Sequence, residues 1–357
     1  MDMKKSSLLI ISVIIISVLG LIMITSASYV WAEYKFDDPF KYFKHQLLFF
    51  LLGLVLMFVV SKINYKIYYS KANLLLLIGL VLLVLVLIPG IGTIRNGSRS
   101  WFGIGAFGIQ PSEAMKLIII IFVSKYLCNN QSKLSVVPVL LIVLLTFGLI
   151  MLQPDFGTGV VMLMIVVGLL FVSGVNLSFF VKIGVLGLIG LTGLIIMAPY
   201  RLKRILSFLN PWEDPLGSGF QIIQSLYAIG PGGLFGFGFG NSRQKHFYLP
   251  EPQTDFIFSI ISEEFGFVGC LLVVALFLTI IIVGLRIARK CDDLFGKYLV
   301  FGIIFWIAFQ SVLNLMVVIG LIPVTGVTLP FLSYGGSSLL ILMVGIGIVI
   351  NVNRYQR

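Results

Sequence analysis

Charged residues are scarce in this sequence: they make up 11% of its 357 residues, while hydrophobic residues make up 59%. Soluble globular domains contain about 25% charged and roughly 45–50% apolar residues, so this composition excludes an ordinary soluble domain. Several apolar runs reach about 20 residues, the length that a helix needs to cross a bilayer. The sequence therefore predicts an all-α polytopic membrane protein with a single domain over residues 1–357.

Histidine and cysteine are also scarce, with two and three residues respectively. Two histidines are too few for a convincing histidine-based site. The three cysteines lie in or beside apolar segments and show neither metal-ligand spacing nor a disulfide framework. The sequence therefore shows no recognisable metal site, and a nucleophilic catalytic triad has no support.

Acidic residues number only 14 against 25 lysines and arginines, which gives a net charge of +11. A basic protein can bind nucleic acid, but this chain has no soluble basic domain that could do so. Anionic lipid head groups and a phosphorylated substrate are better candidates for a binding partner.

Ten apolar segments are expected to form transmembrane helices. The first, residues 7–27, is longer than the apolar core of a signal peptide, about 7–15 residues, and we expect it to stay uncleaved. The other nine are residues 46–61, 72–88, 112–128, 135–153, 157–175, 178–198, 258–285, 297–320 and 335–352. An even number of spans places both termini on one side of the membrane.

The distribution of basic residues predicts which side this is. With cytoplasmic termini, fourteen of the 25 basic residues fall in inner segments and ten in outer segments. Five of those ten lie in one long loop, and long loops contribute little to orientation. We therefore predict cytoplasmic termini and an extracellular loop of about residues 199–257 between helices seven and eight.

The stretch of residues 201–266, which contains most of this loop, carries six of the 14 acidic residues. A long polar loop on a rigid scaffold is where functional residues concentrate, although a merely solvated outer loop is the alternative. Its glycine-rich part, residues 232–240, is similar to phosphate-binding glycine loops. No strand precedes it, so a nucleotide site is only weakly supported.

Asp255 is the leading candidate for chemistry in this stretch. Thr254 precedes an apolar run and is expected to be a helix N-cap, which places Asp255 in the first turn. Glu263 follows about 12 Å along a regular helix and roughly 80° around it, so it could support Asp255 in one cavity. Alternatively, Asp255 only complements the helix dipole. The dipole would lower its pKa, whereas burial would raise it.

Other polar groups lie at the ends of the predicted spans. Glu113 and Lys116 share a helix face and form either a structural ion pair or part of a substrate site. Asp155, in a tight outer turn, is either a turn former or a site residue. The outer connection of residues 323–338 has two prolines and three glycines. It is either broken backbone that lines a cavity or a simple kinked connection.

Six short motifs carry a resemblance to a known family. They are residues 95–101 (RNGSRSW), 110–113 (QPSE), 153–155 (QPD), 210–215 (NPWEDP), 249–256 (LPEPQTDF) and 332–337 (LSYGGS). Over essentially the whole chain, the sequence resembles the SEDS family, the FtsW, RodA and SpoVE proteins of bacterial cell-wall synthesis. Within the family it is most similar to the SpoVE and FtsW branches.

This resemblance implies a ten-span glycosyltransferase of the bacterial cytoplasmic membrane. It would polymerise lipid II into peptidoglycan strands on the outer face, in cell division or in synthesis of the spore cortex and envelope. A class B penicillin-binding protein, which crosslinks the strands, is the implied partner. The family's essential aspartate matches Asp255, and its glutamate, lysine and turn aspartate match Glu113, Lys116 and Asp155.

The residues suit this chemistry. Asp255 would take the proton of the acceptor sugar hydroxyl, a step typically worth about 10²–10⁴ in rate. The leaving group, undecaprenyl pyrophosphate, is strongly negative. Five basic residues are candidates to hold its phosphates: Arg201, Arg204, Arg243, Lys245 and Lys116. By family analogy Mg²⁺ or Mn²⁺ could assist, although the sequence shows no dedicated site.

Two other functions compete with the enzyme. A lipid II flippase would also have many spans, intramembrane charges and a broken outer connection. A carrier needs polar groups accessible from both faces, whereas the acidic groups here cluster on the outer side. A non-catalytic scaffold for a penicillin-binding protein is the third hypothesis, and it predicts that Asp255 is dispensable.

Overall fold

The computed structural model describes residues 2–95, 97–103, 108–131, 135–196, 208–217 and 219–355. Its main helices are α1 (Asp2–Phe36), α2 (Lys41–Val60), α3 (Lys66–Leu85), α4 (Pro111–Asn129), α5 (Val137–Met151), α6 (Phe156–Val172), α7 (Leu177–Ile196), α10 (Ile257–Lys290), α11 (Leu294–Val318) and α12 (Gly336–Tyr355). Each of the ten predicted apolar segments therefore contains a helix.

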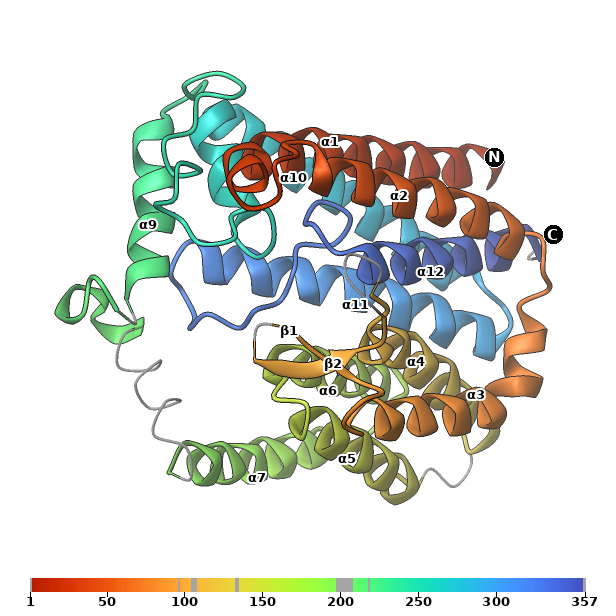
Figure 1. The fold of residues 1–357 in the computed structure, drawn as a ribbon. Coiled ribbons are helices and arrows are strands. Elements are labelled where there is room, and N and C mark those ends of the chain that lie inside the picture. The colour runs from red at the N-terminus through yellow and green to blue at the C-terminus, as the bar shows by residue number, and fades with distance from the viewer. Residues whose placement is uncertain are drawn as a thin grey trace.

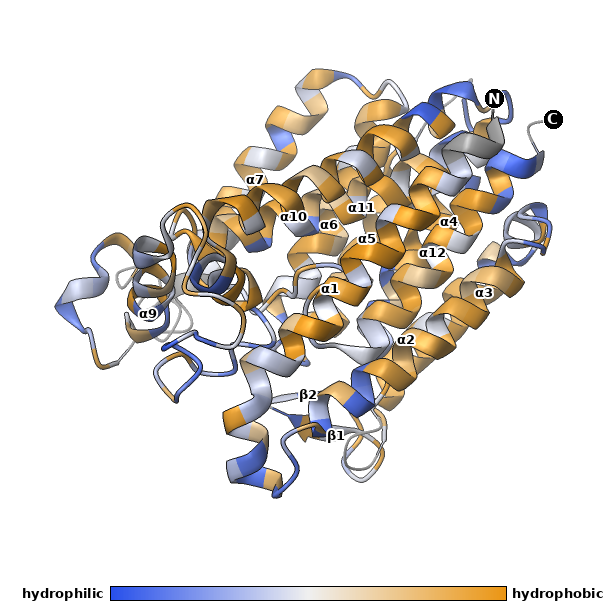
Figure 2. Cartoon of the chain, turned by 90° about the horizontal axis from the view of Figure 1, so that it is seen from above, coloured by the Kyte–Doolittle hydropathy of each residue, from blue (hydrophilic) through white to orange (hydrophobic). Residues whose placement is uncertain are grey.

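The hydropathy of the helices indicates a multi-pass membrane protein. Six of the described helices, α1, α2, α3, α10, α11 and α12, are long and apolar enough to cross a membrane. Shorter apolar helical stretches of 10–17 residues are α5, α6 and the Leu177–Gly190 part of α7. In Figure 2 the helices are predominantly orange, while blue residues gather at the ends of the bundle and in the loops.

The helices pack into one elongated bundle. α1 lies against α2 and α10, α2 against α12, α10 against α11, and α3 against α4. The N and C labels mark the same end of the bundle, and α9 stands at the opposite end (Figure 1). The termini and the described part of the long loop therefore lie at opposite ends of the bundle.

A short link separates α6 from α7, as predicted. Gly174 adopts a φ of 87°, a left-handed conformation that glycine adopts without strain. The Val175 amide donates to the Leu170 carbonyl oxygen at 3.3 Å, which closes the end of α6. The Asn176 side chain then accepts a hydrogen bond from the Ser178 amide and begins α7.

The connections between the helices contain structure that the hydropathy pattern does not reveal. Strands β1 (Thr93–Arg95) and β2 (Ser98–Trp101) form an antiparallel hairpin between α3 and α4. The long loop contains the 3₁₀ turns η1 (Pro211–Glu213) and η2 (Gly230–Gly232) and the helix α9 (Phe220–Ile229). α9 packs on α10 and α11 and buries Ile222 and Ile223.

Helix α10 is broken at Gly266, whose φ of 61° and ψ of −157° lie outside the helical region. The amides of Phe267 and Val268 instead donate to the carbonyl oxygens of Gly233 and Leu234, at 2.9 and 3.1 Å. The sequence-based estimate of 12 Å and 80° between Asp255 and Glu263 assumed a regular helix beginning before Asp255, and the actual helix begins after it.

The glycine-rich run of residues 232–240 packs closely against this broken helix. A Cβ atom on Gly232 would lie 2.2 Å from the Ser262 carbonyl oxygen, and one on Gly236 would lie 2.3 Å from the Glu264 backbone. The glycines therefore permit close contact between two backbones. This contact gives a physical reason for the run that involves no nucleotide.

Candidate functional site

Asp255 lies in the turn that precedes α10. Thr254 was predicted to cap this helix, and that prediction is wrong: its hydroxyl donates to the Glu251 carbonyl oxygen at 2.8 Å, while Phe256 occupies the N-cap position. Asp255 is therefore outside the first helical turn, where the dipole acts most strongly.

A buried amide holds the Asp255 backbone. The Nδ2 atom of Asn314, in the membrane helix α11, donates to the Asp255 carbonyl oxygen at 2.7 Å and to the Val327 carbonyl oxygen at 2.8 Å. Asn314 is fully buried. A residue of the long loop is thus fixed directly to the helical bundle.

The surroundings of the Asp255 carboxyl group favour a base that works near neutral pH. Burial, together with the negative charges of Glu251 and Asp155, raises its pKa to about 7, and burial is the largest of these effects. General bases are most effective when their pKa lies near the operating pH. Of the two opposing effects considered from the sequence, the structure shows the one that raises the pKa, which is burial.

Glu113 and Lys116 form a buried ion pair near the start of α4. The Lys116 Nζ atom lies 2.8 Å from Glu113 Oε1 and 3.1 Å from Gln310 Oε1. It also lies 4.8 Å from the centroid of the Trp306 ring. The Glu113 Oε2 atom is buried and has no hydrogen-bond partner among the described residues. The pair is structural in form, but one carboxylate oxygen can still accept a hydrogen bond.

Asp155 caps α6 and contacts the chain before α4. Its Oδ1 atom accepts a hydrogen bond from the Thr158 amide at 3.2 Å, and its Oδ2 atom accepts one from Gln110 Nε2 at 2.8 Å. Burial raises the pKa of Asp155; the Glu113 charge adds to this increase, and the Lys116 charge opposes it. Asp155 is therefore a turn former that also lies within electrostatic reach of the ion pair.

The irregular connection between α11 and α12 brings these groups together. Gln310 Nε2 donates to the Thr328 carbonyl oxygen at 2.9 Å, next to the Val327 carbonyl that Asn314 holds. A Cβ atom on Gly326 would lie 3.8 Å from Asp255 Oδ2, and one on Gly157 would lie 2.4 Å from the Thr325 carbonyl oxygen.

Residues 325–328 therefore lie between Asp255, Asp155 and the Glu113–Lys116 pair. The prediction of irregular backbone is confirmed, and much of this backbone is held by buried side chains. That it lines a substrate cavity stays a prediction.

Glu263 lies in a different environment from the one predicted. Its carboxylate accepts hydrogen bonds from the backbone amides of Arg243 and Gln244, at 2.9 and 3.3 Å, and from the Ser242 hydroxyl. It therefore holds the loop of residues 242–244 against α10. This explains the buried acid without a direct contact with Asp255.

Lys245 is likewise engaged in structure. Its Nζ atom lies 3.4 Å from Glu264 Oε1 and 3.3 Å from Ser26 Oγ, and it also donates to the Gly240 carbonyl oxygen. The lysine is 7% exposed and Glu264 is fully buried. The predicted role of Lys245 in phosphate binding does not agree with this position, because its ammonium group already joins α1, α10 and the loop.

The arginine predictions have different outcomes. Arg243 is exposed, and its guanidinium lies 5.5 Å from the centroid of the Phe237 ring. Arg201 and Arg204 lie outside the described residues.

Arg95, in β1, was not singled out as a site residue. Its guanidinium lies 4.9 Å from the centroid of the Trp101 ring and beside Gly108, just before the α4 motif.

Comparison with known proteins identifies the family. The family described as "Cell cycle protein" (FTSW_RODA_SPOVE) matches residues 6–357. The chain belongs to this family. The resemblance seen in the six motifs is thereby confirmed.

Curated relatives match along nearly their whole length. The chain is 55% identical to "Stage V sporulation protein E" of Bacillus subtilis, with 100% of both chains covered. It is 44% identical to "Probable peptidoglycan glycosyltransferase FtsW" of Coxiella burnetii, covering 94% of this chain and 92% of the relative.

Solved structures share the fold. A chain described under "Structural coordination of polymerization and crosslinking by a peptidoglycan synthase complex" has a TM-score of 0.81 and 33% identity, covering 98% of this chain and 97% of that chain. The rod shape determining protein RodA of Thermus thermophilus has a TM-score of 0.72 and 30% identity, covering 98% and 96%.

Two positions in the site were missed from the sequence. Gln310 and Asn314 are four residues apart on α11 and therefore face the same side, where they hold consecutive carbonyl groups. Amides within an apolar span were the available signal, because polar side chains there usually bond to neighbouring segments.

Proposed function

We propose that this protein is a peptidoglycan glycosyltransferase that polymerises lipid II into glycan strands, in cell division or in synthesis of the spore envelope. The observation that carries the proposal is near full-length similarity, at 44% identity, to a relative named as such an enzyme. The position and pKa of Asp255 support it, because the reaction needs a base near neutral pH.

In the proposed reaction, Asp255 accepts the proton of the acceptor sugar hydroxyl. The acceptor oxygen then bonds to the anomeric carbon of the donor sugar. The bond from that carbon to the pyrophosphate oxygen breaks, and undecaprenyl pyrophosphate leaves with the electron pair. Asn314 keeps the base in place, since it holds the Asp255 carbonyl at 2.7 Å.

The leaving group carries concentrated negative charge and requires cations. Arg243 is the described residue of the predicted set whose position best suits this role, because it is exposed in the outer loop. Arg201 and Arg204 stay candidates from the sequence. Lys116 would act from within its ion pair, by setting the charge around Asp155 and Glu113.

A divalent cation stays an expectation from the family. The described residues contain no group of three or more His, Cys, Asp or Glu side chains that could hold a metal ion. Mg²⁺ can be held by one or two carboxylates together with substrate phosphates, so it does not require such a group. We assign no step of the reaction to a metal.

The orientation follows from the proposal. Ten spans, cytoplasmic termini and an external loop of residues 199–257 would place Asp255 on the outer face of the cytoplasmic membrane. A cysteine probe at Asn241 should react with an impermeant reagent in intact cells, and one at Lys290 should be protected. The opposite pattern would reverse the orientation.

A crosslinking partner is the second part of the proposal. A producer of linear strands needs a transpeptidase nearby, and a structural relative at 33% identity is described as a peptidoglycan synthase complex. We expect a class B penicillin-binding protein to contact the lipid-facing side of a span and the outer loops. Mild-detergent purification from native membranes should recover it, and its consistent absence would count against the partnership.

The deciding experiment compares purified wild-type and Asp255→Asn protein, each with its partner and with the transpeptidase blocked. We expect wild-type protein to make strands from lipid II and the variant to be slower by at least about 10²-fold. Equal rates would remove Asp255 from the mechanism. Absence of polymer from both, with lipid II crossing vesicles only when wild-type protein is present, would favour the flippase.

A further inference from the structure

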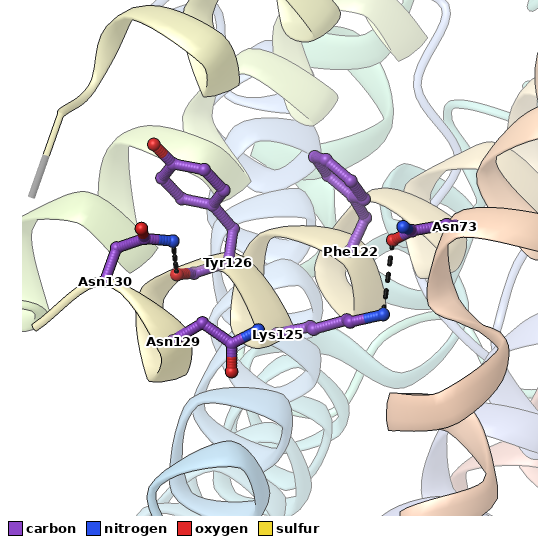
Figure 3. Close-up of a pocket in the computed structure, with 6 residues that line it drawn as sticks. All are labelled: Asn73, Phe122, Lys125, Tyr126, Asn129 and Asn130. Carbon is purple, nitrogen blue, oxygen red and sulfur yellow. Dashed lines mark hydrogen bonds between the residues drawn. The ribbon is translucent and has the colours of Figure 1, made fainter.

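A cavity of about 270 Å³ lies between α3 and α4 at the end of the bundle that holds the termini. Figure 3 shows the six residues that line it: Asn73, Phe122, Lys125, Tyr126, Asn129 and Asn130. Glu113 lies in the first turn of α4 and Asn129 ends this helix, so the cavity and the proposed active site lie at its opposite ends. The glycosyl transfer proposed above does not use it.

Hydrogen bonds orient the amides that line the cavity. Lys125 Nζ donates to Asn73 Oδ1 at 3.3 Å, and the Tyr69 hydroxyl donates to Asn129 Oδ1 at 2.5 Å. Because both carbonyl oxygens accept these bonds, each amide keeps its NH₂ group for donation. Lys125 has further ammonium protons that it can donate.

The charge of the lining selects the ligand. Lys125 supplies a positive charge, and none of the six lining residues is acidic. The Lys125 Nζ atom lies 5.4 Å from the centroid of the Tyr69 ring, a contact that keeps the cation at this position. An ammonium group and two amide NH₂ groups match the oxygen atoms of a phosphate group.

The surface beside the cavity is apolar. Leu74, which directly follows Asn73, and Leu77 and Ile78, about one turn further along α3, are 50%, 60% and 45% exposed. A free phosphate ion would leave this surface unused, whereas a phospholipid would cover it with an acyl chain. The apolar surface therefore favours a lipid over a soluble anion.

We infer that this cavity binds the phosphate group of an anionic phospholipid from the leaflet on the side of the termini. Lys125, Asn73 and Asn129 bind the phosphate oxygens, and the acyl chains lie along α3. The lipid would hold the α3 and α4 ends together at the membrane surface.

The test uses the purified full-length protein and native mass spectrometry to count bound lipids. The probes are phosphatidylglycerol, phosphatidylcholine and inorganic phosphate. We expect wild-type protein to retain phosphatidylglycerol over phosphatidylcholine. Lys125→Gln should lower phosphatidylglycerol occupancy about fivefold, the contribution of one lysine near an anionic surface. The control Lys71→Gln removes the same charge from an exposed α3 residue outside the cavity and should have little effect.

A second variant distinguishes a built site from general attraction. Asn73→Leu with Asn129→Leu keeps the net charge and should also lower phosphatidylglycerol occupancy. Unchanged occupancy in this double variant, or equal losses in Lys125→Gln and Lys71→Gln, would overturn the inference. Displacement of phosphatidylglycerol by millimolar inorganic phosphate would assign the cavity to a free anion instead.

Discussion

The amide nitrogen of Asn314 lies 2.7 Å from the carbonyl oxygen of Asp255, 59 residues earlier in the chain. The same nitrogen lies 2.8 Å from the Val327 carbonyl oxygen. One side chain of α11 therefore holds together the end of the long loop and the irregular connection before α12. The candidate base depends on a residue that itself has no acid–base chemistry.

Replacing Asn314 with Leu should displace Asp255 while keeping the volume of the side chain. Two buried carbonyl groups would lose their donor, which costs about 1–3 kcal/mol each. We expect kcat for lipid II polymerisation to fall about tenfold to a hundredfold, with a smaller change in KM. Ser311→Ala is the matched control, because that hydroxyl bonds only within its own helix, to Ile307. Equal effects in both variants would contradict a positioning role.

The rate of polymerisation should rise with pH through about 7, because Asp255 must lose its proton to act as a base and burial raises its pKa to about 7. Initial rates between pH 5.5 and 8.5, at saturating lipid II, would measure this. Asp255→Asn should lack this ascending limb as well as most of the activity. A wild-type profile that is flat over this range would mean that another group takes the proton.

The same carboxyl group should lower the stability of the folded protein at alkaline pH. Its folded pKa of about 7 exceeds the ordinary value of 3.8, so the folded state holds the proton more tightly. Stability therefore falls as the pH rises from about 4 to about 7. We expect the melting temperature of Asp255→Asn, relative to wild type, to increase between pH 5 and pH 8. A constant difference would show that Asp255 titrates normally.

Lys245 and Glu264 should behave as a buried pair. Lys245→Met alone leaves the Glu264 carboxylate buried without its cation, which typically destabilises a protein by about 3–5 kcal/mol. The double variant with Glu264→Gln should recover much of the loss in thermal stability. Arg243 is an exposed residue two positions before Lys245. Arg243→Gln should leave thermal stability unchanged but weaken lipid II binding in a salt-dependent manner. If Lys245→Met instead weakened lipid II binding in a salt-dependent manner while thermal stability stayed normal, the predicted role of Lys245 in phosphate binding would be restored.

Gly266→Ala should impair folding. The φ of 61° and ψ of −157° belong to a region that is essentially restricted to glycine, and an added Cβ would lie 2.5 Å from the Gly236 nitrogen. Gly187→Ala in α7 is the control, because an added Cβ there meets no atom within 4 Å. Yield of monodisperse protein in detergent measures the outcome. Similar yields of the two variants would mean that the backbone at the break in α10 tolerates a different conformation.

Apolar composition and run length were enough to predict the helices, since each predicted segment contains one. The motifs were enough to predict the family. The N-cap at Thr254 and the placement of Glu263 were wrong because local propensity does not include the contacts of a distant loop. Lys245 could not be assigned for the same reason: its partner Ser26 lies 219 residues away.

The hairpin was also missed, although its Asn96–Gly97 pair is a typical turn signal. Its strands of three and four residues are too short for an alternating pattern to be evident. Asp255 was singled out from the sequence, but its pKa depends on burial, which follows from tertiary packing such as the approach of Gly326 to its carboxylate.

The tie between Asp255 and α11 fixes the height of the base above the bilayer. The 25 residues of α11 would extend about 37 Å, and Asn314 lies near the C-terminal end of this helix. A substrate anchored by its lipid tail is held at a height set by the same bilayer. The lipid-anchored substrate and the Asp255 carboxylate therefore meet by lateral diffusion in the plane of the membrane. A bilayer of altered thickness would shift the sugar of the substrate vertically relative to the carboxylate.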